Sequence, residues 1–155
     1  MRPLPGSVSL VVLALGLLSA GCSRAPVTED YRILANQALQ SMGEWDQLNE
    51  RLKEGCLNNP EKLKQGCQPA LSSDYYSLPP RANRHFDYTV KVKKSSGDER
   101  VQEHLADYMK ALDEEWKAIQ AAEPKPLVLV NAAEADRLRE QKAKARKAVE
   151  EGLAP

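Results

Sequence analysis

Two stretches of the chain carry apolar residues at helical spacing. In the first, from 31 to 52, the apolar positions are Tyr31, Leu34, Ala38, Trp45, Leu48 and Leu52. In the second, from 101 to 119, they are Val101, Leu105, Tyr108, Leu112, Trp116 and Ile119. Steps of three and four residues predict two amphipathic helices. We expect their apolar faces to pack together, with Trp45 and Trp116 in the contact.

A third stretch alternates instead. In "FDYTVKVK", residues 86–93, apolar side chains alternate with polar ones. This period of two predicts a half-buried strand. Its candidate partner is "LVLV", residues 127–130. Without a partner, the strand would have an open edge and allow binding by strand addition.

The segments between these elements are less regular. Residues 68–85 contain Pro69, Pro79 and Pro80, which predict irregular structure. The adjacent Tyr75 and Tyr76 suggest either a partner surface, because tyrosine is enriched at interfaces, or a loop that covers the core.

Residues 131–155 hold strong helix formers but few large apolar side chains. The pattern predicts a projecting charged helix or a soluble tail. Such a helix would be an arm that reaches a partner or the cell wall.

Together these patterns predict a mainly α fold with a small β element (α+β). We expect one small globular domain over 31–130, with the charged helix or tail over 131–155.

The beginning of the chain has a different character. Residues 8–20 are almost wholly apolar and follow the basic Arg2. The run is shorter than the roughly 20 residues that span a membrane. A basic start, an apolar middle and small residues at the end are typical of a secretory signal peptide.

The end of this run, "LSAGC", resembles the lipobox of bacterial lipoproteins, although Ser19 stands where leucine is commonest. The resemblance covers residues 1–22 only. It implies removal of 1–21, lipidation of Cys22 and attachment to the membrane, with 22–30 as a tether. Ser23 after the cysteine resembles the outer-membrane default, so we expect an envelope protein that faces the periplasm.

Two further cysteines, Cys56 and Cys67, remain. In an oxidising compartment such a pair predicts a disulfide, here one that staples a short helix between them to the helix before it. The rival interpretation is a metal site formed with His85 and His104, but the spacing matches no standard zinc pattern.

Charge and motifs limit the function. The chain has 155 residues, with 22 basic and 22 acidic groups, and this balance argues against a nucleic-acid binder. No phosphate loop, nucleophile elbow or metalloprotease motif is present in the sequence. His104 and Asp107 share a helix face, which suggests half a metal site or a surface ion pair. We therefore expect no enzyme, no cofactor and no metal.

The sequence best suits a lipid-anchored, non-enzymatic adaptor or assembly factor for a larger envelope complex, of the secretion, conjugation or lysis type. The alternative is a binding module or inhibitor for a small or soluble periplasmic target.

Overall fold

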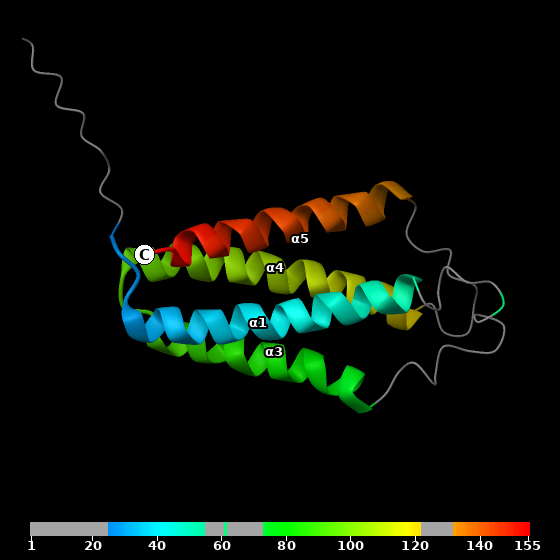
Figure 1. The fold of residues 1–155 in the computed structure, drawn as a ribbon, viewed down its shortest axis with the longest axis horizontal. Helices are drawn as coiled ribbons and strands as arrows, with labels where there is room; N and C mark the ends of the chain where they lie inside the picture. Colours follow the sequence, from blue (N-terminus) through cyan, green and yellow to red (C-terminus); the bar gives the residue numbers. More distant parts are fainter. Residues whose placement is uncertain (1–24, 55–60, 62–72, 122–131) are drawn as a thin grey trace, which may run out of the picture.

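The computed structural model describes residues 25–54, 61, 73–121 and 132–155, and within them the chain forms four long helices. These are α1 (Glu29–Leu52), α3 (Ser73–Val92), α4 (Ser96–Ala121) and α5 (Ala132–Leu153). The helices lie side by side and successive ones run in opposite directions (Figure 1). The most extensive contacts are those of α1 with α3 and of α4 with α5, and the contact of α1 with α4 joins the two pairs.

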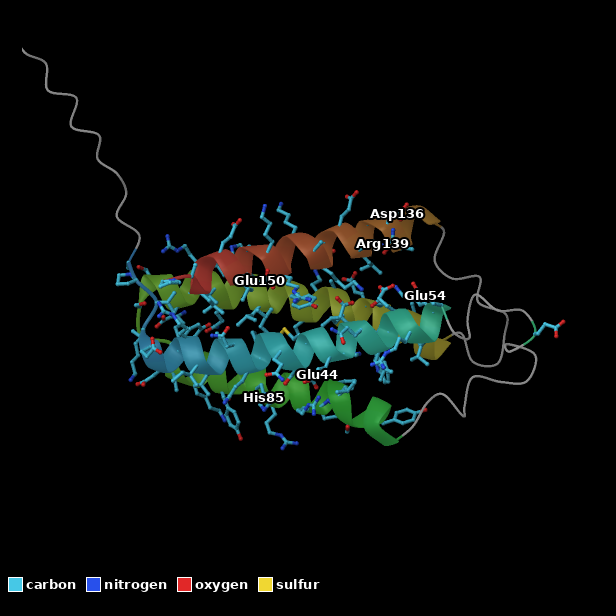
Figure 2. The ribbon with its side chains drawn as sticks, in the orientation of Figure 1. Glu44, Glu54, His85, Asp136, Arg139 and Glu150 are labelled. Atoms are coloured by element: carbon cyan, nitrogen blue, oxygen red, sulfur yellow. The ribbon has the colours of Figure 1, made fainter. Side chains whose placement is uncertain are left out.

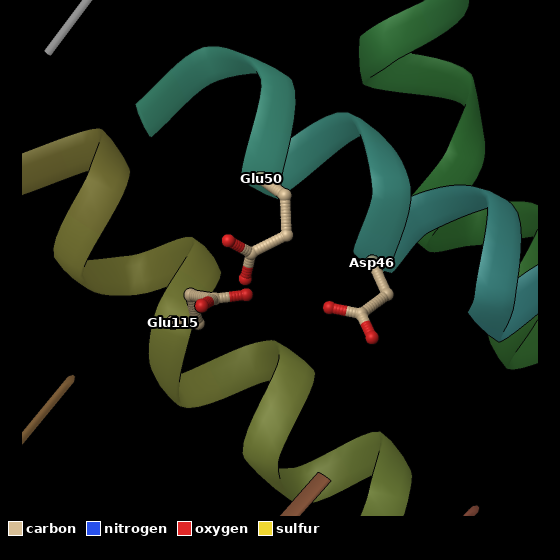
Figure 3. A group of neighbouring side chains, drawn as sticks. All are labelled: Asp46, Glu50 and Glu115. Atoms are coloured by element: carbon tan, nitrogen blue, oxygen red, sulfur yellow. The ribbon is translucent and has the colours of Figure 1, made fainter. Parts of the chain in front are cut away.

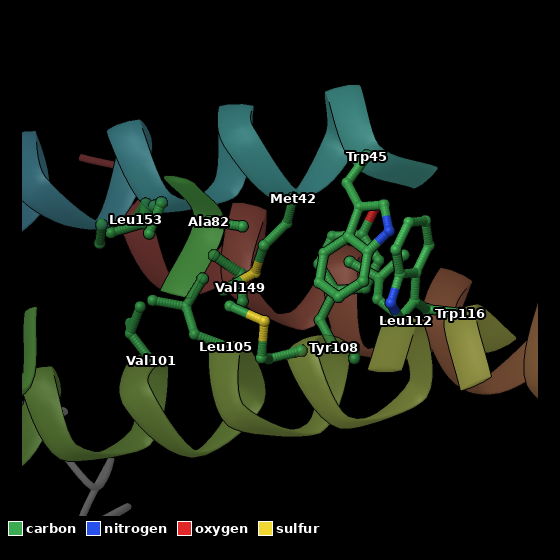
Figure 4. Packing of buried hydrophobic residues seen from close by; sticks show 14 of the residues in the cluster. Met42, Trp45, Ala82, Val101, Leu105, Tyr108, Leu112, Trp116, Val149 and Leu153 are labelled. Carbon is green, nitrogen blue, oxygen red and sulfur yellow. The ribbon is translucent and has the colours of Figure 1, made fainter. Parts of the chain in front are cut away.

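The two amphipathic helices predicted from the sequence are confirmed as α1 and α4. Every apolar position that predicted the second helix is buried on α4, and on α1 Tyr31, Ala38, Trp45 and Leu52 are buried. Trp45 and Trp116 meet edge to face, with ring centroids 6.1 Å apart. Figure 4 shows these residues with Met42 and Leu105 in the layer between the helices. The expected packing of the two apolar faces is therefore correct.

The predicted strand over 86–93 is wrong, because residues 86–92 belong to α3. No strand occurs in the described parts of the chain, so the fold there is all-α, not α+β. The residues of α3 that face the bundle are Leu78, Ala82, Phe86, Thr89 and Val92, at helical steps. Thr89 is fully buried, whereas Tyr88 and Val90 are exposed. A polar residue on the buried face and apolar residues outside it produced the apparent alternation.

The expected irregular structure over 68–85 is also wrong from Ser73 onward. Pro79 and Pro80 lie inside α3. A proline has a backbone φ angle that suits a helix, but it loses the hydrogen bond to the carbonyl four residues earlier and its ring crowds that carbonyl. Pro79 and Pro80 are the seventh and eighth residues of α3, so these costs fall within its first two turns. The Pro79 carbonyl accepts a bond of 3.0 Å from the Asn83 side chain. Residues 68–72 and 127–130 lie outside the described residues.

The C-terminal segment is helical but does not project from the domain. Leu138, Ala145, Val149 and Leu153 are buried, and α5 packs along α4. The buried face of α5 has few large apolar residues, and Ala145 and the aliphatic stem of Lys142 complete it. The Lys142 side chain is only 4% exposed. The predicted projection is wrong because a small alanine and a lysine stem join the three large apolar residues in one buried face, which a count of large apolar residues does not reveal.

Candidate functional site

The described chain begins at the same end of the bundle as the C-terminus and the turn between α3 and α4 (Figure 1). We call this the entry end and define it by residues 25–28, 95–98 and 154–155. The opposite end carries the first turns of α3 and the last turns of α1 and α4. We call it the far end, and it includes Tyr76.

Asp98 organises the entry end. Its carboxylate accepts bonds from the Thr28 backbone N–H (3.0 Å), the Thr28 hydroxyl (3.1 Å) and the backbone N–H groups of Lys94 (3.0 Å) and Ser95 (3.1 Å). The Ser95 hydroxyl oxygen accepts a bond of 3.3 Å from the Asp98 N–H. This exchange is a capping box at the start of α4. Ser95 is therefore the residue that caps α4, and Asp98 is its partner in the first turn.

The same carboxylate also holds the start of α1. Thr28 precedes α1 but makes no side-chain bond to its own helix. Asp98 is fully buried, which alone would raise its pKa, but the hydrogen bonds outweigh burial and hold the pKa below its ordinary value. One ionised side chain therefore joins two helix starts.

Gly97 lets the entering segment lie against α4. A Cβ at this position would be 2.5 Å from the Ala25 carbonyl oxygen. The Ser95 hydroxyl donates to the Pro26 carbonyl at 3.4 Å, and Arg100 donates to the Ala25 carbonyl at 3.5 Å. Residues 25–28, part of the expected tether, are thus packed onto the bundle.

A cavity of about 440 Å³ lies beside this segment. Charged or titratable side chains of Arg32, Arg100, His104 and Glu151 line it, together with Gly97 and the C-terminal Pro155. His104 thus lies at the entry end. Asp107, with which it was expected to form a metal half-site or an ion pair, is exposed on the outer face of α4. No ion pair joins the two in the part of the chain that the structure describes.

A second polar cluster lies between α1, α4 and α5. Asp46, Glu50 and Glu115 point toward one another, with carboxylate oxygens within 4.8 Å (Figure 3). Lys142 from α5 reaches all three: its Nζ lies 2.5 Å from Asp46, 3.1 Å from Glu50 and 2.9 Å from Glu115. Three carboxylates at this spacing suit a metal ion, but here the ammonium group of Lys142 is the cation that they share.

Neighbouring groups complete this cluster. Lys53 lies 2.6 Å from both Glu50 and Glu115, and the Asn49 amide donates to Glu115 at 3.0 Å. Burial alone would lower the pKa of Lys142, but Asp46 and Glu115 raise it above its ordinary value. Burial would raise the pKa of Glu50, yet Lys53 and Lys142 bring it below its ordinary value. Lys142 and Glu50 are therefore both charged at neutral pH.

The other histidine, His85, lies between α1 and α3. Its Nδ1 is 2.6 Å from the hydroxyl of Ser41, and an Arg81–Glu44 ion pair lies alongside (Figure 2). A serine nucleophile needs access to substrate and nearby free N–H donors. Ser41 is 4% exposed and lies in the middle of α1, where backbone N–H groups bond within the helix. This geometry makes the pair a contact between helices.

At the far end, Tyr76 is 52% exposed. Its ring meets Trp116 edge to face, with centroids 6.2 Å apart, and Trp116 in turn meets Trp45. The exposed ring is therefore supported by the core. The side chain of Tyr75 lies outside the described residues, so the structure places only one of the two predicted partner residues.

Sequence reasoning missed Asp98 as a link between helices and missed Lys142. In the sequence Lys142 is one lysine among many in a charged segment. Only the position of α5 against α1 and α4 gives it a role.

The other predicted sites, the lipidation site Cys22 and the disulfide pair Cys56 and Cys67, also lie outside the described residues. Among the helices that are described, none combines the length and apolar character needed to cross a membrane. Comparison with protein-family models, with curated proteins and with solved structures finds nothing that matches this chain.

Proposed function

We propose that this protein is a lipid-anchored envelope lipoprotein that serves a larger envelope complex as a non-enzymatic adaptor or assembly factor. The lipobox at Cys22 supports the anchor, and the chain enters the bundle just after it. The entry end is separated from the far end by the length of α1, whose 24 residues extend about 36 Å. An anchor at the entry end would hold the far end away from the membrane, where a partner can reach it.

The observation that carries the proposal is the exposed ring of Tyr76 against Trp116 at the far end. Binding energy at interfaces concentrates on tyrosine, tryptophan and arginine. A rigidly supported tyrosine loses little conformational freedom when a partner covers it. The partner class that fits is therefore an envelope protein with an apolar or aromatic-binding surface.

The test is capture of envelope proteins from solubilised membranes by the mature chain, in wild-type form and as Tyr76→Ser. Tyr88→Ser is the matched control, because Tyr88 is an exposed tyrosine on the same helix near the other end. We expect Tyr76→Ser to weaken retention by roughly 30-fold, as for a hot-spot residue, and Tyr88→Ser to leave it unchanged. Equal retention by all three forms would contradict the proposed surface.

The same capture separates the adaptor from the alternative. A component retained from the membrane fraction supports the adaptor, whereas one retained only from the soluble periplasmic fraction supports a binding module or inhibitor. Deleting 131–155 is not a useful variant here, because α5 is part of the bundle.

The anchor is tested separately by Cys22→Ala in the full precursor. We expect this variant to lose incorporation of labelled fatty acid and to remain unprocessed. Normal acyl labelling of the variant would contradict a lipid anchor at Cys22.

A further inference from the structure

The docked segment at the entry end limits how far the bundle can stand from a lipid anchor. Only Ser23 and Arg24 separate Cys22 from Ala25. Three consecutive Cα–Cα steps span at most about 11 Å, whatever conformation they take. From Ala25 onward the chain is held by the bundle.

Four contacts hold this segment. Thr28 bonds Asp98 through both its N–H and its hydroxyl, Pro26 accepts from Ser95, and Ala25 accepts from Arg100. Ala25 also lies where a side chain on Gly97 would collide with its carbonyl. The sequence alone suggested a tether over 22–30, but the structure leaves at most three residues free to act as one.

We infer that the protein has no stalk and that its entry end lies against the lipid headgroups of the leaflet that holds the anchor. This inference rests on the lipid anchor of the proposed function. The occupant of the surface is the headgroup layer, because the length of chain between Cys22 and Ala25 brings nothing else so close. Tyr76 is then carried away from the membrane on the far end.

Charge does not drive this contact. Among the exposed cations near the entry end, Lys93 and Lys94 are paired with Glu99 (2.7 Å) and Asp30 (3.7 Å), and Arg100 donates to the Ala25 carbonyl (3.5 Å). The long faces of the bundle also mix both signs, as Asp136, Arg139 and Glu150 show along α5 (Figure 2). A surface of mixed charge gains little binding energy from anionic lipids. The contact is therefore set by the short length of chain between Cys22 and Ala25, and added salt should leave the energy transfer unchanged.

The test measures energy transfer from a fluorescent amino acid in the full, processed protein to labelled lipid in vesicles of phosphatidylethanolamine and phosphatidylglycerol. The fluorophore replaces Ser96 at the entry end or, in a separate protein, Lys117 toward the other end of α4; both positions are exposed. They lie about 30 Å apart along the helix, so we expect transfer from position 96 to exceed that from position 117 by at least about twofold. Equal transfer would overturn the end-on contact.

Two variants test the tether. A flexible Gly/Ser linker of about 18 residues inserted between Arg24 and Ala25 spans about 23 Å and should abolish the difference between the positions. Gly97→Ala should reduce the difference by detaching residues 25–28, with helicity retained. If the wild-type protein already matches the linker variant, the inference is wrong.

Mass spectrometry of Cys22 shows whether a negative result refutes the lipid anchor or only the end-on contact with the membrane. An unlipidated protein refutes the anchor itself. A lipidated protein with equal transfer refutes only the inference.

Discussion

Asp98 bonds Thr28, which lies 70 residues earlier in the sequence, and so links the start of α1 to the start of α4. A carboxylate that accepts several N–H bonds is strongly stabilised in its charged form. The residue therefore acts on both local and tertiary structure: it closes the first turn of α4 and fixes the point at which the chain enters the bundle. The residues that flank Asp98 in the sequence give no sign that it also holds the start of α1.

We expect Asp98→Asn to lower the free energy of unfolding by about 2 kcal/mol at neutral pH, because an amide accepts fewer of these bonds and carries no charge. Urea denaturation followed by circular dichroism measures the change. Asp107→Asn, an exposed position on the same helix, is the control and should change stability by less than about 0.5 kcal/mol. Equal effects of the two substitutions would contradict the linking role.

The hydrogen bonds to the Asp98 carboxylate also predict that the free energy of unfolding depends on pH. The folded pKa of Asp98 is lower than the unfolded value of about 3.9. Its contribution to stability is therefore present above pH 4 or so and is lost as the pH falls through the folded pKa. Stability measured between neutral and acidic pH should fall less steeply at the acidic end for Asp98→Asn than for the wild-type chain. Parallel curves would show that Asp98 is not the titrating group.

Lys142 is the second decisive residue. Its removal takes away the buried cation that pairs with the buried Glu115 and with the partly exposed Asp46 and Glu50. Because a buried charge then loses its partner, Lys142→Met should cost about 3–5 kcal/mol. Lys144→Met is the control, because Lys144 is exposed and lies two residues after Lys142 on the same helix. In a double-mutant cycle, Glu115→Leu should be less destabilising in the Lys142→Met background than in the wild type. Additive effects would show that the two residues are not coupled.

At the scale of elements, α1 and α4 were predictable because large apolar residues recur at helical steps along their buried faces, although Ser41, Asn49, Asp98 and Glu115 are buried there too. The structure of α3 was not. Its buried face includes Thr89, which satisfies its hydroxyl by donating to the Phe86 carbonyl at 2.7 Å, and His85, which contacts Ser41. Local polar contacts of this kind allow a helix to bury residues that a hydrophobic pattern assigns to the surface.

The helical register of α3 gives a direct test. We expect Thr89→Asp, at a fully buried position, to cost more than about 2 kcal/mol, and Val90→Asp, at a position 45% exposed, to cost less than about 0.5 kcal/mol. Urea titrations of the two variants measure the difference. A strand with Val90 facing inward would give the opposite order.

At the scale of the whole molecule, the predicted lipobox and the contacts within the bundle differ in how a sequence can reveal them. The resemblance to a lipobox rests on five contiguous residues, so it can be stated from the sequence and stays a prediction. The entry-end contacts and the shared cation Lys142 join residues from separate helices, and no contiguous signal marks them. Tyr76 was partly predictable. Its residue type suggested an interface, but only the structure shows that its ring is exposed and packs against Trp116.

The predicted bond between Cys56 and Cys67 concerns the connection from α1 to α3. We expect the mature protein purified from the envelope under oxidising conditions to show no reactive thiol from either residue, and reduction to release both. A thiol-reactive dye applied to the denatured protein, before and after reduction, makes the measurement. A bridge closing a loop of this length would add roughly 3 kcal/mol. Two reactive thiols in the untreated protein would contradict it.

The burial of Lys142 has a consequence for biosynthesis. α5 supplies the cation for carboxylates on α1 and α4, which precede it in the chain and are synthesised earlier. A nascent or truncated chain that ends before residue 142 holds acidic groups that resist burial and an apolar face without its cover. We therefore expect the bundle to close only after α5 has been synthesised. Chains truncated before residue 142 should be cleaved faster by proteases than chains that include α5.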